Sequence, residues 1–339
     1  MHRIKMQRRP KPVAVALAAL MVAGTVAACG SSGGGGQATI TVGYQPDLHG
    51  AAPVLIAQKE GFFRKVGLNV NFQQFTSGPP LFTALKSGSL DFGYEGPGVA
   101  ATVIKGGGQV ITVDSLNMGD EVVANPSITS VSALKGRTVA VVLGTSAQMI
   151  LDLALKNAGL PPSSVNEVNF TPAAAASAYE SHHIPALALW IPPIVPAAKA
   201  VSGTNVLVTD KNFMPAYQFP QFWITMKSYA KAHPQIVTKF LEAWIMADNW
   251  RMTHTAQTVN VVSSTVGVEA STLAAQVAAT HWLSGSELGS IYRNHQEYAW
   301  YSKLEQFFVQ DKLLTSVVPP NQFIDTSYFM NALKARHLG

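Results

Sequence analysis

The chain has little charge and almost no cysteine. Charged residues make up 13% of its 339 residues, about half the share found in an average soluble domain. Apolar residues make up 47%, and this balance excludes intrinsic disorder, which needs low hydrophobicity and high net charge. The single cysteine, Cys29, cannot form a disulfide within the chain, so the apolar core must stabilise the fold.

Beyond its first residues the chain also lacks an excess of positive charge. The formal net charge is +5, and Arg3, Lys5, Arg8, Arg9 and Lys11 account for all of it, because residues 1–28 contain no acidic side chain. Residues 29–339 therefore carry no net charge. A basic face that binds nucleic acid is not expected on such a chain.

The N-terminal segment has the pattern of an export signal. A basic stretch that ends at Lys11 precedes an uncharged apolar run over residues 13–28. A run of sixteen residues is shorter than the roughly 20 that cross a bilayer as a helix, but it suits the apolar region of a signal peptide. The pattern predicts a signal peptide over residues 1–28.

The end of that run, Val26-Ala27-Ala28-Cys29-Gly30, resembles the lipobox of bacterial lipoproteins. The resemblance implies cleavage before Cys29 and attachment of diacylglycerol to its thiol. Residues 29–37, rich in serine and glycine, would then form a flexible tether, and lipid would anchor an extracytoplasmic protein to the cell membrane. The alternatives are an ordinary signal peptide with a chance cysteine and a twin-arginine signal at Arg8-Arg9.

Short strands alternate with helices from residue 38 onward, which is typical of α/β folds with parallel sheets. After residue 226 apolar residues recur at helical spacing. We expect an α/β fold with lobe one over residues 38–125 and 218–339, the second part helical, and lobe two over residues 126–217. Predicted strands include residues 39–44, 68–75, 90–94, 109–115, 121–125 and 186–190, and predicted helices include residues 53–60, 146–158 and 234–251.

Seven short motifs follow one another along the chain. They are Val42-Gly43-Tyr44, Gln58-Lys59-Glu60-Gly61-Phe62-Phe63, Ser77-Gly78-Pro79-Pro80, Leu90-Asp91-Phe92-Gly93-Tyr94-Glu95-Gly96-Pro97-Gly98, Leu134-Lys135-Gly136-Arg137-Thr138-Val139-Ala140, Gly144-Thr145-Ser146 and His233-Pro234-Gln235-Ile236-Val237. In this order they resemble solute-binding proteins of bacterial ABC importers, in the branch that binds nitrate, sulfonates and taurine. The resemblance implies a type II periplasmic-binding-protein fold, with two lobes, two chain crossings and a ligand in the cleft between the lobes. Two departures are Ile191, where the family often has aspartate after the tryptophan, and Pro185, which replaces an acidic residue.

Two turns that precede predicted helices are candidate anion sites. Each offers a hydroxyl group and backbone N–H groups at the positive end of a helix dipole, which favours an oxoanion. Ligands of open α/β sheets bind beyond the carboxyl ends of the strands, where these turns are expected. The alternative is that their serines are ordinary helix caps. The predicted contacts are Ser77, Gly78 and Pro79 in one turn and Gly144, Thr145 and Ser146 in the other.

Acidic and aromatic residues provide further candidates. Glu95 follows a predicted strand and, with Tyr94 and Gly96, is predicted to contact the ligand. Its carboxylate would repel a bare anion and pair with an amine, whereas the alternative is a solvent-facing or backbone-capping glutamate. Asp47 and His49 lie in the loop after the first strand, with a turn or surface role as their alternative.

Two aromatic residues, Trp190 and Tyr217, are candidate walls against an alkyl chain. The alternative for both is core packing, which we expect for Trp223. His182-His183 has no third ligand at metal spacing, so no metal site is predicted.

These features predict a binding protein rather than an enzyme, because residues 144–148 do not form a Gly-x-Ser-x-Gly motif and there is no second cysteine. We expect a monomer without a cofactor that captures a small sulfonate-like anion or zwitterion, an aliphatic sulfonate or taurine. It would close about a hinge near Asn125 and residues 217–220 and deliver the solute to an ABC permease and its ATPase. The alternatives are the same role for nitrate, bicarbonate or a pyrimidine-type thiamine precursor, a ligand-sensing receptor ectodomain, and an enzyme similar to pyrimidine-precursor synthases.

Overall fold

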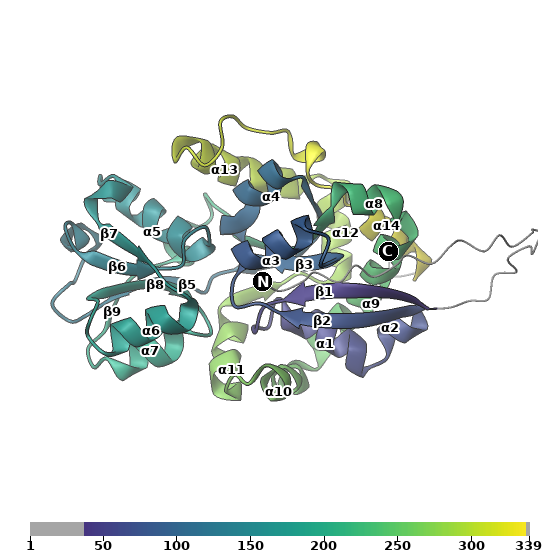
Figure 1. Cartoon of the computed structure of the whole chain (residues 1–339), viewed down its shortest axis with the longest axis horizontal. Helices are drawn as coiled ribbons and strands as arrows, with labels where there is room; N and C mark the ends of the chain where they lie inside the picture. The colour runs from purple at the N-terminus through teal and green to yellow at the C-terminus, as the bar shows by residue number, and fades with distance from the viewer. Residues whose placement is uncertain (1–36, 337–339) are drawn as a thin grey trace, which may run out of the picture. The chain divides into compact units, whose positions relative to one another are not determined.

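The computed structural model describes residues 37–336. The predicted signal peptide, Cys29 and all of the predicted tether except Gln37 lie outside these residues. Among residues 37–336, no helix combines the length and the apolar composition that a membrane crossing requires. The described chain contains two β-sheets with helices packed on them (Figure 1), and each sheet with its helices is one lobe.

Lobe one contains the strands β1 (Ala38–Tyr44), β2 (Leu68–Gln74), β3 (Phe92–Glu95), β4 (Gly108–Asn117), β10 (Pro220–Met226) and β11 (Thr280–Trp282). They form one sheet in the order β11-β4-β10-β3-β1-β2. The predicted parallel pairing is confirmed for β1 with β2 and β3. It is wrong for β4, which pairs antiparallel with β10 and with β11, because residue patterns do not encode strand direction.

Lobe two contains the strands β5 (Asp120–Ala124), β6 (Thr138–Val141), β7 (Asn166–Asn169), β8 (Ala186–Trp190) and β9 (Asn205–Thr209). Their order is β7-β6-β8-β5-β9. β6 runs parallel to β7 and β8, and β5 pairs antiparallel with β8 and β9. The antiparallel β5 therefore lies inside the second sheet.

The position of β5 corrects the expected lobe boundary. The chain leaves lobe one after β4 and enters lobe two at residues 118–119, rather than at residue 125, and it returns over residues 210–219. The outgoing crossing therefore precedes Asn125, near which the hinge was expected, whereas the return crossing ends where lobe one was expected to resume. The composition of residues 121–125 predicted a strand, but it could not show to which of the two sheets the strand belongs, because the same composition suits both.

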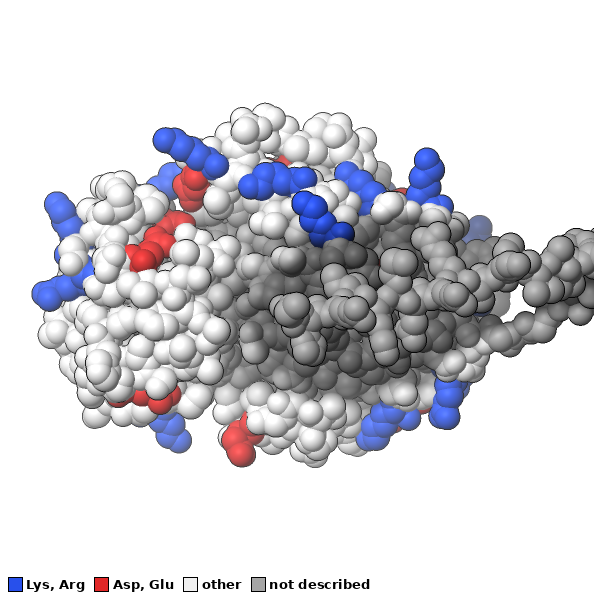
Figure 2. All heavy atoms as spheres, in the orientation of Figure 1, with Lys and Arg blue, Asp and Glu red and all other residues white. Residues whose placement is uncertain are grey.

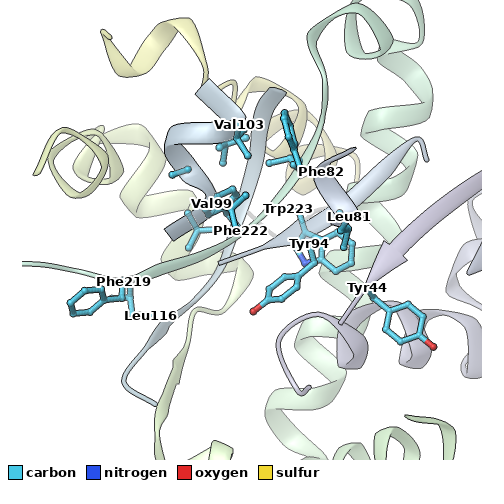
Figure 3. Packing of buried hydrophobic residues seen from close by; sticks show 14 of the residues in the cluster. Tyr44, Leu81, Phe82, Tyr94, Val99, Val103, Leu116, Phe219, Phe222 and Trp223 are labelled. Atoms are coloured by element: carbon cyan, nitrogen blue, oxygen red, sulfur yellow. The ribbon is translucent and has the colours of Figure 1, made fainter. Parts of the chain in front are cut away.

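The helices of lobe one are α1 (Ala51–Lys59), α2 (Phe62–Lys65), α3 (Gly78–Lys86), α4 (Ala100–Gly106), α8 (Lys227–Ala232), α9 (Pro234–Thr253), α10 (Thr255–Val266), α11 (Ala270–Ala278), α12 (Gly285–Arg293), α13 (Gln296–Gln310) and α14 (Ser327–Ala335). The buried helix α9 packs against the sheet, where Phe240 stacks on Phe92 with 4.1 Å between ring centroids. Trp223 is fully buried beside Tyr94 (Figure 3). The prediction that Trp223 packs in the core is confirmed.

In lobe two, α5 (Ser146–Asn157) lies on one side of the sheet, and α6 (Pro172–Glu180) and α7 (Ile194–Ala200) lie on the other (Figure 1). Strand β8 shows why both faces are covered. Ala188 belongs to the apolar cluster that includes α5, whereas Leu187 and Leu189 pack with residues of α6 and α7. Successive side chains of a strand point to opposite faces, so an entirely apolar strand needs helices on both.

Charged side chains are scattered over the described surface. On the face shown in Figure 2, basic and acidic groups lie mainly around the edge, with red and blue groups near one another. Within the described part of that face no basic patch is seen. This distribution agrees with the absence of net charge beyond the first residues.

Candidate functional site

A small cavity of about 30 Å³ lies at strand ends where lobe one meets lobe two. We name it the polar pocket. A cavity measured in this way needs about 10–15 Å³ for one water molecule, so the polar pocket has room for a small polar group. Eight predicted site residues line it: Asp47, His49, Gly78, Tyr94, Gly96, Thr145, Ser146 and Trp190. Six further lining residues are Gln45, Val99, Asn117, Ile191, Gln221 and Gln276.

The directions of the strands explain why these residues meet. β1 and β3 run parallel, so the segments that follow them, which begin at Gln45 and Gly96, lie at the same edge of the sheet. β10 runs in the opposite direction and brings its first residues, including Gln221, to that edge. The Tyr94 hydroxyl points away from the core cluster (Figure 3) and donates a 2.6 Å hydrogen bond to Gln221 Oε1.

Two helices begin at the polar pocket, α3 at Gly78 and α5 at Ser146. Their cap residues, Ser77 and Thr145, make no side-chain capping hydrogen bond. The Ser146 hydroxyl instead donates to Asp120 Oδ1 at 2.8 Å. Ser77 thus occupies the cap position of α3 without making a capping hydrogen bond, and Ser146 is the first residue of α5 rather than its cap. The positive ends of both helix dipoles therefore lie at the pocket without a side-chain capping hydrogen bond.

Asp47 supplies a carboxylate to the same pocket. Its Oδ1 accepts hydrogen bonds from the backbone N–H groups of His49, at 2.9 Å, and Gly50, at 2.6 Å. No described residue donates a hydrogen bond to its other oxygen, Oδ2. Burial raises the pKa of Asp47 to about 6. The carboxylate is thus ionised at neutral pH and incompletely paired, which suits it to bind a cationic group.

His49 is held in place from both sides of its ring. Its Nδ1 lies 2.7 Å from Ser115 Oγ, and its Nε2 lies 3.2 Å from Thr280 Oγ1. Ser115 Oγ also donates to Asp114 Oδ2 at 2.8 Å. The imidazole that lines the pocket therefore has a fixed orientation, set by strand β4 and by Thr280 of β11.

A buried ion-pair cluster lies behind His49. Nη2 of Arg251 is 2.8 Å from Oδ1 of Asp114 and 2.8 Å from Oδ1 of Asp248, and all three side chains are fully buried. Arg251 comes from α9, so the cluster links this core helix to β4 and, through Ser115, to His49. A buried charge needs such partners to offset its desolvation.

Glu95 does not line the polar pocket, contrary to the prediction. Because successive strand residues point to opposite sides, Glu95 turns away from the side that Tyr94 takes and lies against Gly78, where a Cβ atom would overlap Glu95 Oε2. Neither carboxyl oxygen has a hydrogen-bond partner among the described residues. Burial raises the pKa of Glu95 well above the usual glutamate range. Its position supports neither the predicted amine contact nor a solvent-facing role.

Four other predicted site residues also lie outside the pocket lining, namely Ser77, Pro79, Gly144 and Tyr217. Ser77 is buried beside Gly78. Gly144 has a left-handed backbone, with φ +73°, that turns the chain into α5, and the Cβ position at this glycine lies 3.5 Å from Pro79. Tyr217 stacks on Phe219, with 6.4 Å between ring centroids. These four residues shape the turns and the return crossing rather than the pocket wall.

Three of the lining residues that the sequence did not predict are buried or nearly buried amides on regular elements. Asn117 ends β4, and Gln221 lies near the start of β10. Gln221 was not predicted as a site residue because only the carboxyl ends of strands were considered. An antiparallel strand such as β10 brings its amino end to the same edge of the sheet. Gln276 lies on α11, for which no helix boundaries were predicted. The available signal for Gln221 was a single amide within an otherwise buried strand, and for Asn117 it was an amide at the end of a buried strand.

The two chain crossings are joined by hydrogen bonds. Nδ2 of Asn117 donates to Oδ2 of Asp120 at 2.9 Å and to Oδ2 of Asp210 at 3.2 Å. The backbone N–H of Asp120 also donates to that Asp210 oxygen at 2.9 Å. Burial raises the pKa values of both carboxyl groups, which favours a proton on this pair. The cluster thereby fixes the beginning of β5 to the end of β9.

Further contacts connect the lobes around the pocket. Oε1 of Gln276 accepts a 2.7 Å hydrogen bond from the Leu48 N–H, and its Nε2 donates to the Ile191 carbonyl at 3.3 Å. Gly98, in the short 3-10 helix Pro97–Val99 of lobe one, lies directly against the backbone of Thr145 and Ser146 in lobe two. The two lobes therefore touch through backbone as well as side chains.

Comparisons with known proteins agree with this architecture. The alkanesulfonate-binding protein SsuA of Xanthomonas axonopodis pv. citri, solved with bound MOPS, has a TM-score of 0.69 at 19% identity, over 86% of this chain and 99% of that chain. This likeness confirms the predicted periplasmic-binding-protein type of α/β fold. A Brucella abortus (strain 2308) protein, named only as a binding protein, is 30% identical over 290 residues, which are 86% of this chain and 91% of that protein.

Sequence similarity also extends to proteins with a named ligand. A Bacillus subtilis (strain 168) protein named as an aliphatic sulfonates-binding protein is 26% identical over 330 residues, which are 93% of this chain and 95% of that protein. A family model described as NMT1/THI5 like matches residues 49–257. Since this match spans more than half of the sequence, the chain belongs to the NMT1/THI5-like family.

Proposed function

We propose that the protein is the extracytoplasmic solute-binding component of an ABC importer and that it captures a small sulfonate-like anion or zwitterion. The observation that carries the proposal is the combination of two uncapped helix starts and the Asp47 carboxylate in one pocket. The helix starts favour a sulfonate group, and the carboxylate favours an ammonium group. An aminosulfonate such as taurine satisfies both, so we expect it to bind better than a plain alkanesulfonate. The name of the Bacillus relative supports this ligand class.

Capture follows from the division of the pocket between the lobes. Asp47 and Gly78 belong to lobe one, and Ser146 and Trp190 belong to lobe two. A solute held between them contacts both lobes at once, so it stabilises the closed arrangement over an open one. The closed protein then delivers the solute to a permease with its ATPase. This role needs no covalent chemistry, and a lipid on Cys29 keeps the monomeric protein at the membrane.

Isothermal titration calorimetry of the purified protein tests the proposal. Taurine is expected to release heat with one site per chain and to bind most tightly, because ethanesulfonate, nitrate and bicarbonate carry no ammonium group for Asp47. Nitrate and bicarbonate are expected to bind weakest, because they also lack an alkyl group that could pack on Trp190. The absence of binding by both sulfonates would overturn the proposed ligand class. A rank order with nitrate above taurine would contradict the role of Asp47.

The variant Asp47→Asn isolates the ammonium contact. The amide oxygen still accepts the backbone hydrogen bonds from His49 and Gly50, so the turn is expected to remain. Loss of a charged hydrogen bond of about 1.5–3 kcal/mol corresponds to about ten- to hundredfold weaker taurine binding. The affinity of the variant for ethanesulfonate is expected to remain unchanged or to increase. Glu95→Gln is the matched control, and an equal loss of taurine binding in both variants would refute this assignment.

The same carboxylate predicts a pH dependence. Asp47 has a pKa of about 6 in the free protein, and a bound ammonium group favours its ionised form. Protons therefore compete with taurine, so the affinity is expected to be constant above about pH 7 and to fall as the pH drops through about 6. Titrations at several pH values measure this dependence. It should disappear in Asp47→Asn, and persistence there would assign the titration to another group.

A further inference from the structure

A second and larger cavity adjoins the polar pocket. Its volume is about 480 Å³, and it shares two wall residues, Asp47 and Trp190, with the polar pocket. We name it the outer cavity. Its size falls within the range of about 300–1,000 Å³ that is typical of small-molecule sites, whereas the polar pocket holds only a few atoms. A solute bound at Asp47 and Trp190 therefore has room to extend in one direction, into the outer cavity.

The walls of the outer cavity are chiefly carbon. Proline has no N–H group to donate, and aromatic rings present mainly apolar surface, so such walls suit an apolar group. The only charged residues that line it in the described chain are Asp47 and Glu269. Both are acidic, which disfavours a second anionic group there. The principal apolar wall residues are Pro46, Trp190, Pro192, Pro193, Pro196 and Val268.

The fold builds this cavity from both lobes. Lobe two supplies the end of β8, the turn into α7 and the start of α6, and lobe one supplies the loop after β1 and the start of α11 (Figure 1). Unlike α3 and α5, helix α6 has a side-chain cap, because Thr171 accepts a hydrogen bond from the Ala174 N–H at 3.4 Å. Helices α7 and α11 also begin at the outer cavity, after Pro193 and Glu269, and neither has a side-chain cap. At the start of α11, however, the Glu269 carboxylate lines the cavity and disfavours an anion there.

We infer that the solute is an aminosulfonate whose nitrogen carries an apolar substituent, with its charged groups in the polar pocket and its substituent in the outer cavity. This inference rests on the proposed function and narrows its substrate class. The attachment point follows from Asp47, which lines both cavities and would contact the ammonium group at their boundary. An apolar substituent between Trp190 of lobe two and Val268 of lobe one also adds contacts that favour closure.

Calorimetric titrations of the full chain with taurine, N-methyltaurine and N-cyclohexyltaurine test the inference. Burial of one methylene group strengthens binding by up to about fourfold, so N-cyclohexyltaurine is expected to bind at least about tenfold more tightly than N-methyltaurine. Its binding should also show a more negative heat-capacity change. If taurine binds but N-cyclohexyltaurine binds equally or more weakly, this inference is overturned and the proposed function stands. If none of the three binds, both are overturned.

Two neighbouring substitutions locate the substituent. Ala173 lines the outer cavity, and the adjacent Ala174 is exposed on the same helix and does not line it. In Ala173→Trp the affinity ratio of N-cyclohexyltaurine to N-methyltaurine is expected to fall toward one, because the indole fills the space. The ratio should stay at or above about tenfold in the matched control Ala174→Trp. An unchanged ratio in both variants would place the substituent elsewhere and overturn the assignment.

Discussion

Arg251→Met is expected to lower the free energy of unfolding by about 3–5 kcal/mol. The substitution keeps an unbranched side chain of similar length but removes the positive charge that lies 2.8 Å from both Asp114 and Asp248. Two carboxyl groups would then remain buried without a counter-ion. Urea-induced unfolding at neutral pH, followed by tryptophan fluorescence, measures the loss.

A second arginine provides the matched control for this prediction. Arg336 pairs with Glu242 at 2.7 Å, but its side chain is 29% exposed, and such partly solvated pairs contribute at most about 1 kcal/mol. Arg336→Met is therefore expected to have a small effect, although it too breaks an ion pair with α9. Similar losses in both variants would show that burial of the Arg251 cluster is not the cause.

Gly98→Ala is expected to weaken taurine binding by about a hundredfold or more. Its Cβ atom would overlap the backbone of Thr145 and Ser146, and backbone cannot move aside as a flexible side chain can. Overpacking of about 3 kcal/mol is relieved if the lobes separate, so the variant should fold and remain open. Calorimetry measures the affinity, and small-angle X-ray scattering in the presence of ligand measures the separation.

Gly289→Ala is the control for the effect of removing a glycine. Gly289 lies in helix α12, and a Cβ atom at this position would lie 3.5 Å from the nearest side-chain atom, which belongs to Arg293. We expect unchanged taurine affinity and a gain of up to about 1 kcal/mol in stability, since alanine favours helix. If Gly98→Ala also binds taurine normally, the contact between Gly98 and the start of α5 is not needed for closure.

Local patterns predicted the elements of the fold well. The helix expected over residues 146–158 is Ser146–Asn157, and the strand expected over residues 186–190 is Ala186–Trp190. Both depend on the spacing of apolar residues, which neighbours in sequence determine. The pairing of β5 with β8 and β9 depends instead on residues far along the chain. A strand's composition therefore predicted its existence but not its sheet.

The candidate site likewise has parts that the sequence predicted and parts that it did not. The turns at Gly78 and Ser146 were predictable because small residues and helix starts follow strands, and the family resemblance pointed to the same segments. Tyr94 and Glu95 were both predicted to contact the ligand, but only Tyr94 lines the polar pocket. The sequence could not tell them apart, because a shift of one residue reverses the side to which a strand residue points. Arg251 was also missed as a functional support, since its partner Asp114 lies 137 positions away and no local pattern joins them.

The side chain of Asn117 has a mechanical consequence. One amide group holds the outgoing connection between the lobes at Asp120 and the returning connection at Asp210. Neither connection can then swing independently while these bonds persist. We therefore expect the lobes to turn as rigid bodies about a single pivot beside Asn117, so that opening widens the entrance most at the side farthest from it and sideways sliding is suppressed.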